Sequence, residues 1–131
     1  MRRRELVFVM IALAMTCTEL RAHHSTVAYT EKSIVLRDAT IAKVLWANPH
    51  IVLTFKVRAT DGKVSDWNVE TGSPGSVARV GWNRNSVKSG DKVTIELYPA
   101  RNGANVGRLK KVVFPDGREL LDSQNPTSLK K

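Results

Sequence analysis

The sequence predicts an all-β domain with one short helix, folded as an OB-like barrel of five to six strands. The chain has 131 residues, which is enough for one domain with a modest core. Strand-like segments follow one another in the order strand, strand, strand, short helix, strand, strand. A helix between the third and fourth strands is the order of an OB-type barrel. A small β-sandwich is the alternative, and the helix at residues 73–81 favours the barrel.

The first two strands are indicated by residue type and by alternation. Residues 34–46 are rich in Ile, Val, Leu and Thr, which favours one long strand with a bend or bulge. Pro49 has no N–H to donate to a neighbouring strand, so it marks a corner. Residues 51–58 then alternate between apolar and mostly polar side chains, which predicts a second strand with one buried face.

The turn at residues 60–62 predicts a hairpin, and the length of its loop decides the strand register. A three-residue loop places Phe55 opposite Trp67, so that apolar side chains share one face of the hairpin. A two-residue loop would set Phe55 opposite an asparagine instead. The three-residue register also makes His50 and Glu70 diagonal neighbours on the more polar face.

A short helix is predicted for residues 73–81, where Ser73 supplies a cap, Pro74 suits the first helical position and Gly81 closes the helix. Trp82 follows, and we expect it to plug one end of the core. The remaining expectations are a strand at residues 93–97, a Gly/Asn-rich loop at 99–107, a strand at 108–114, a turn at 115–117 and a short final strand at 118–121.

The first 22 residues have the order of a secretory signal peptide. Three arginines at residues 2–4 precede an apolar run at 6–15, and Ala22 offers a small residue at the cleavage point. The run is about half the roughly 20 residues that a spanning helix needs, so no stable membrane span is expected after cleavage. The predicted organisation is a signal peptide at 1–22, a barrel domain at 23–121 and a disordered tail at 122–131, in a periplasmic or secreted protein.

The net charge and the cysteine content limit the kinds of partner and chemistry that the sequence allows. The formal net charge is +9, which predicts attraction to anionic surfaces such as phosphate or membrane headgroups. The basic residues are scattered along the sequence, so a solvated surface is the simpler interpretation. Cys17 is the only cysteine and lies in the predicted leader, which excludes disulfides, thiolate nucleophiles and cysteine-bound zinc in the mature protein.

Several short motifs follow one another in order across residues 23–121. They are His23-His24-Ser25, Trp46-x-Asn48-Pro49-His50, Trp67-x-x-Glu70-x-Gly72-Ser73-Pro74, Arg79-x-Gly81-Trp82, Lys88-x-Gly90-Asp91 and Asp116-Gly117-Arg118. In these motifs the chain resembles a family of small exported bacterial proteins that is classed as a domain of unknown function. The resemblance implies a bacterial source and a location outside the cytoplasm, and it implies no particular activity.

The three histidines and Glu70 form the candidate metal site. If the leader is cut after Ala22, His23 carries the free α-amino group and chelates through its amine and ring, with His24 or His50 completing the set of nitrogen ligands. A cut one residue earlier would make His24 the third residue from the amine, which is another strong chelate for copper or nickel. Both arrangements favour copper, which imidazole suits. Glu70 would be a further ligand or would hold the His50 ring.

The same histidines also have a structural interpretation. His50 follows Asn48-Pro49 and would fill a corner by hydrogen-bonding backbone groups that proline leaves unpaired. His23 and His24 would then belong only to a mobile end of the chain.

No enzymatic motif is present. The sequence has neither a nucleophile elbow with a Ser-His-Asp set nor a phosphate-binding glycine loop. Nucleic-acid binding, which is common among OB barrels, is not expected because the register assigns Trp67 to the apolar face. We therefore expect a monomeric, non-catalytic protein that binds a metal ion or small ligand, with copper favoured. The alternative is a structural or interaction module whose basic surface docks an anionic partner in the cell envelope.

Overall fold

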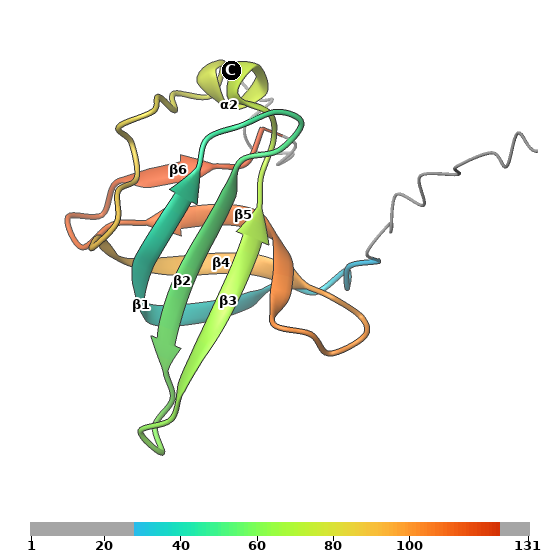
Figure 1. The fold of residues 1–131 in the computed structure, drawn as a ribbon, viewed down its shortest axis with the longest axis vertical. Coiled ribbons are helices and arrows are strands. Elements are labelled where there is room, and N and C mark those ends of the chain that lie inside the picture. Colours follow the sequence, from blue (N-terminus) through green and yellow to red (C-terminus); the bar gives the residue numbers. More distant parts are fainter. Residues whose placement is uncertain (1–27, 124–131) are drawn as a thin grey trace, which may run out of the picture.

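Five strands close into a barrel, and a sixth strand extends its wall (Figure 1). The computed structural model describes residues 28–123. The strands are hydrogen-bonded in the order β3-β2-β1-β4-β5-β6, and additional pairing of β3 with β5 closes the barrel. The OB-like barrel with one short helix is thus confirmed, and the sandwich alternative is wrong. The elements are β1 (Ile34–Leu45), β2 (Val52–Arg58), β3 (Val64–Glu70), α2 (Pro74–Ala78), β4 (Lys92–Pro99), β5 (Val106–Val113) and β6 (Glu119–Leu121).

β1 is long because it serves both halves of the barrel wall. Its first part pairs with β4, and its last part pairs with β2. The register shifts once between Leu36 and Ala39, where Asp38 has a φ of 52°, and again between Ile41 and Lys43. Such bulges bend a strand and increase its twist, which a small closed barrel requires. The bend predicted for the first strand is therefore present.

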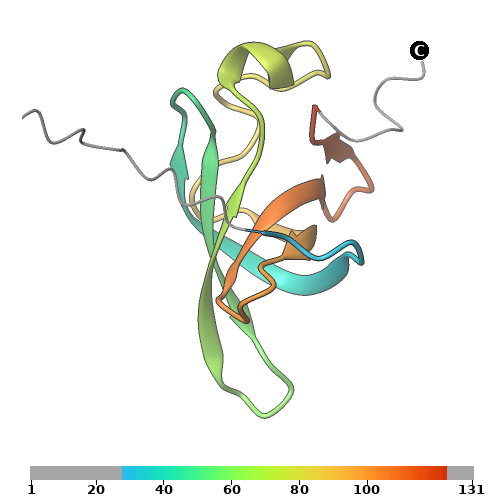
Figure 2. The same cartoon turned by 90° about the vertical axis from the view of Figure 1, so that its right-hand side faces the viewer.

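The β2–β3 hairpin has the predicted register. Phe55 lies opposite Trp67, and the Ala59 N–H donates to the Lys63 carbonyl at 2.8 Å, which leaves a three-residue loop. Gly62 in that loop has a φ of 84°, a conformation that glycine adopts without steric cost. The hairpin extends beyond the barrel at the end opposite α2 (Figures 1 and 2).

The helix begins where the sequence predicts and ends earlier. The Ser73 side chain accepts a hydrogen bond from the Ser76 N–H, and Pro74 occupies the first turn. The helix ends at Ala78 with Arg79 as its cap, because the next N–H groups bond three residues back and tighten the turn. Gly81 closes this last turn, as predicted: its φ is 98°, its N–H donates to the Ala78 carbonyl at 3.2 Å, and the Trp82 N–H donates to the Val77 carbonyl at 3.2 Å.

The core fills the barrel and continues under α2. Trp82 is 3% exposed, and its Nε1–H donates to the Leu121 carbonyl at 2.8 Å. Val77 of α2 is fully buried in the same cluster, so the helix and Trp82 together cover one end of the barrel, as expected. Alternate residues of β4 face inward, which confirms the predicted inner face at Val93, Ile95 and Leu97.

β5 is bordered by three strands. One edge pairs with β4, while the other edge is divided between β3 at residues 106–108 and β6 at residues 111–113. Gly107 lies at the crowded part of this junction. A Cβ there would lie 2.6 Å from Leu97 Cδ1 and 2.9 Å from the Tyr98 carbonyl oxygen, so only glycine fits without displacing the chain.

The boundary predicted for the C-terminal tail is wrong by two residues. Asp122 is 2% exposed, and Ser123 hydrogen-bonds Ser76, so both belong to the fold. The sequence alone does not distinguish a buried aspartate from an exposed one, and the donors that allow Asp122 to be buried, Thr71 and Gly72, lie about 50 residues earlier. The rest of the predicted tail and the predicted leader lie outside the described residues.

Within residues 28–123, no helix is both long enough and apolar enough to cross a membrane.

We predict that Gly107→Ala destabilises the barrel by about 1–3 kcal/mol, because the added methyl group overpacks the junction of β5 with β4. Gly75→Ala is the matched control. No atom lies within 4 Å of a Cβ at Gly75, and the position is helical, so alanine there should be neutral or slightly stabilising. Chemical denaturation monitored by tryptophan fluorescence measures both. Equal stability of the two variants would contradict the close approach at Gly107.

Candidate functional site

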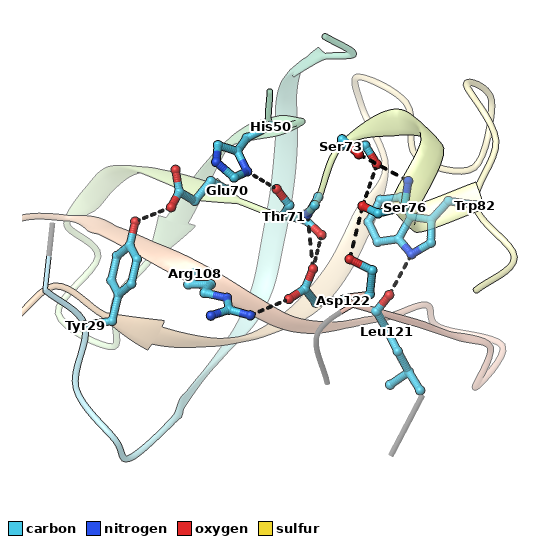
Figure 3. A network of polar contacts seen from close by, with 12 residues as sticks. Tyr29, His50, Glu70, Thr71, Ser73, Ser76, Trp82, Arg108, Leu121 and Asp122 are labelled. Carbon is cyan, nitrogen blue, oxygen red and sulfur yellow. Dashed lines mark hydrogen bonds and ion pairs between the residues drawn. The ribbon is translucent and has the colours of Figure 1, made fainter. Parts of the chain in front are cut away.

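A small polar pocket lies where four distant parts of the chain meet. Its volume is about 130 Å³. Its walls come from the segment before β1, the corner before β2, the end of β3 and residues on and after β5. The lining residues are Tyr29, His50, Glu70, Thr71, Gly72, Arg108 and Asp122, most of which are drawn in Figure 3.

The ring of His50 is oriented by the main chain just after β3. The corner that ends in His50 contains a cis peptide bond between Asn48 and Pro49. The Ile51 N–H then bonds the Gly72 carbonyl, and the Nδ1 of His50 lies 3.1 Å from the Thr71 carbonyl. A carbonyl only accepts hydrogen bonds, so Nδ1 carries the hydrogen. In the neutral ring Nε2 then keeps its lone pair, and His50 as a whole is exposed.

Glu70 is held from the opposite side by Tyr29. The Tyr29 hydroxyl donates to Glu70 Oε1 at 2.7 Å (Figure 3). Burial raises the pKa of the Tyr29 phenol well above its ordinary value, and the hydrogen bond to Glu70 and its negative charge raise it further. The charge of Arg108 acts in the other direction. Tyr29 is therefore a neutral donor at physiological pH.

The segment that carries Tyr29 is fixed by backbone bonds. Tyr29 forms an isolated antiparallel bridge with Ala100, just after β4. The Arg101 N–H donates to the Ala28 carbonyl at 2.9 Å, and the Arg101 Nε–H donates to the Tyr29 carbonyl at 2.8 Å. These bonds bring the start of the described chain to the wall of the pocket.

Asp122 forms the floor of the pocket. Its Oδ1 accepts from the Thr71 hydroxyl at 2.7 Å and from the Gly72 N–H at 3.1 Å. Its Oδ2 lies 3.2 Å from Arg108 Nη2, so the carboxylate joins the end of the fold to β5 and to the segment between β3 and α2 (Figure 3). A buried carboxylate with several donors stays ordered and holds its neighbours in place.

Of the predicted site residues, His50 and Glu70 come together at this pocket, as the register required. His23 and His24 lie outside the described residues. Among residues 28–123, no three His, Cys, Asp or Glu side chains are grouped closely enough to hold a metal ion. The sequence did not identify Tyr29, Arg108 or Asp122 as lining residues. The order of strands in an OB barrel places β5 beside β3, which was the one observation that could have indicated Arg108.

We predict that the Tyr29 phenol in the folded protein ionises above the usual value near 10. Because the pKa is raised on folding, this contribution to stability is complete below about pH 10 and is lost as the pH rises further. A Tyr98→Phe variant leaves Tyr29 as the only tyrosine of the two in the chain, so tyrosinate absorbance reports it directly. A folded-state midpoint equal to that of the denatured protein would contradict the Tyr29–Glu70 contact.

Asp122→Ala is expected to destabilise the protein by about 3 kcal/mol, because it leaves the Thr71 hydroxyl, the Gly72 N–H and the Arg108 charge without their shared acceptor. Asp66→Ala removes an exposed pair with Lys56 and should remain close to wild type. Urea denaturation measures the difference. If both variants lose the same stability, Asp122 does not have the structural role described.

A family model described as "Family of unknown function (DUF6152)" matches residues 11–110, about three quarters of the chain. Comparison with curated proteins and with solved structures gives no significant match. The matched segment contains Tyr29, His50, Glu70 and Arg108, so most of the pocket wall lies inside it. The chain therefore belongs to this family of unknown function.

Proposed function

We propose that this protein is exported and binds a metal ion, with copper favoured, through His50 and Glu70 together with the N-terminal histidines His23 and His24. Its role would be to handle or deliver the ion and not to catalyse a reaction. The observation that carries the proposal is the orientation of the His50 ring by the Thr71 carbonyl at 3.1 Å.

The orientation of His50 suits a metal ligand. Metal-binding histidines usually donate the second ring N–H to a carbonyl or carboxylate, which fixes the tautomer and makes the other nitrogen more basic. His50 has such a partner in Thr71, and the ring is exposed at the mouth of the pocket.

Glu70 supplies a second oriented group. Tyr29 holds one of its carboxylate oxygens, Oε1, in a defined direction. The Arg108 charge in the pocket is opposed by the buried Asp122 carboxylate, which reduces its repulsion of a bound cation. His50 and Glu70 alone are too few ligands for a tight copper site, so the remaining donors must come from elsewhere in the chain.

The N-terminal histidines are close enough along the chain to supply those donors. Tyr29 is part of the pocket wall, and His24 precedes it by only five residues. A chain segment spans at most about 3.5 Å per residue, so a tether of five residues reaches at most about 17 Å. Tethering at this length gives a high effective concentration at the pocket. Cleavage of the leader after Ala22 would add the free amine of His23 to the ligand set.

Copper titration of the correctly processed protein tests the proposal. We expect His50→Ala to weaken Cu²⁺ affinity at least as much as loss of an orienting partner does, which is about 10- to 100-fold. Glu70→Gln should weaken it less. Glu31→Gln, an exposed carboxylate away from the pocket, is the matched control and should leave affinity unchanged.

A second comparison tests the N-terminal ligands. Protein that retains extra residues before His23 lacks the free histidine amine, so electron paramagnetic resonance should report fewer nitrogen donors to Cu²⁺. Equal affinity of wild type and His50→Ala would remove His50 from the site. Equal spectra for the two N-termini would remove the amine.

A further inference from the structure

The connection between α2 and β4, the first residue of β4 and the adjoining part of β1 together carry five cations without acidic partners. We call these residues the basic band; all of them are exposed, and they are Lys43, Arg79, Arg84, Lys88 and Lys92. In the part of the chain that the structure describes, none of the five forms an ion pair. Of the ten other Lys and Arg residues there, six form ion pairs, and Lys32, Arg37, Arg58 and Arg101 do not. The band is therefore defined by where its cations lie in the fold: four follow α2 within 14 residues, and the connection bonds to β1 beside the fifth.

The connection is fixed to the barrel, so its charges have defined positions. The Gly90 N–H donates to the Ile41 carbonyl at 2.8 Å, and the Ser89 hydroxyl donates to the Ala42 carbonyl at 2.9 Å. These two bonds place the end of the connection beside β1 (Figure 1), at the residues that precede Lys43.

The one acidic residue of the connection does not neutralise the band. Asp91 is the only Asp or Glu among residues 79–92. Its Oδ2 accepts from the Lys88 backbone N–H at 2.8 Å, so its carboxylate serves to close the turn before β4. The four cations of this segment therefore present a strongly positive surface.

The kind of partner follows from what the band lacks. The only aromatic residue among residues 79–92, Trp82, is 3% exposed and packs in the core, so this segment offers no ring for stacking on nucleic-acid bases. The charges run along an outer connection and are separated by small polar residues such as Ser86 and Ser89. Separated point charges of this kind suit an extended anionic surface with many equivalent phosphates, which is the property of lipid headgroups.

We propose that the basic band binds the folded protein to the anionic phospholipid headgroups of a bilayer as a peripheral protein. The band follows the connection that leaves α2, while the β2–β3 hairpin lies at the opposite end of the barrel (Figures 1 and 2). The interaction is electrostatic and acts within a Debye length of about 8 Å at physiological ionic strength. It does not depend on the metal site.

Vesicle co-sedimentation of the processed protein tests this. Wild type should bind mixed vesicles of phosphatidylglycerol and phosphatidylcholine, and this binding should weaken as the salt concentration is raised. It should not bind vesicles of pure phosphatidylcholine. A variant with glutamine at four positions of the band should bind more weakly by about fivefold per residue, or roughly several hundredfold if the contributions add. The four changes are Arg79→Gln, Arg84→Gln, Lys88→Gln and Lys92→Gln.

A control variant removes the same number of positive charges elsewhere. It replaces exposed cations by glutamine at Lys32, Lys56, Arg58 and Lys63. We expect it to keep most of the affinity, and circular dichroism confirms that both variants are folded. Equal losses in the two variants, or no binding of wild type to anionic vesicles, would overturn the proposal. Tighter band-dependent binding to single-stranded DNA than to the vesicles would overturn it in favour of a nucleic-acid partner.

Discussion

The arrangement of the pocket depends on one buried carboxylate. Asp122 takes hydrogen bonds from a side chain and a backbone N–H between β3 and α2, and it forms an ion pair with a residue of β5. Those elements meet at the closing seam of the barrel, where β3 and β5 pair over only a few residues. Asp122 and the backbone bonds between Ile51 and residues 71–72 together fix the position of the Thr71 carbonyl that orients His50. The carboxylate at the floor of the pocket therefore contributes to the geometry at its mouth.

The predictable parts of the fold are those that depend on residues close together in the sequence. Alternation fixed the strands, and a register argument of only a few residues placed Phe55 against Trp67 and brought His50 to the same side as Glu70. Ser73 and Pro74 likewise marked the start of the helix from neighbouring residues alone. These features depend on contacts that are close in sequence or repeat with a regular period, so the amino-acid pattern contains them.

The features that were not predicted depend on contacts between residues far apart in the sequence. Asp122 is buried because Thr71 and Gly72, 51 and 50 residues earlier, offer donors to it. Tyr29 lines the pocket because Arg101 and Ala100 hold its backbone beside the loop after β4. The basic band forms because Gly90 and Ser89 bond to β1 and bring the connection after α2 beside the strand that carries Lys43. No window of sequence contains these relationships, since each is created by closure of the barrel.

The divided edge of β5 links the seam that closes the barrel to the C-terminal strand that carries Asp122 into the pocket. One half of that edge completes the barrel through β3, and the other half carries β6, whose chain leads directly into Asp122. A longer β3 would compete with β6 for the same backbone donors and acceptors. A change in the length of the β3–β5 seam would therefore shift β6. Because β6 leads into Asp122, the same change would alter the floor of the pocket.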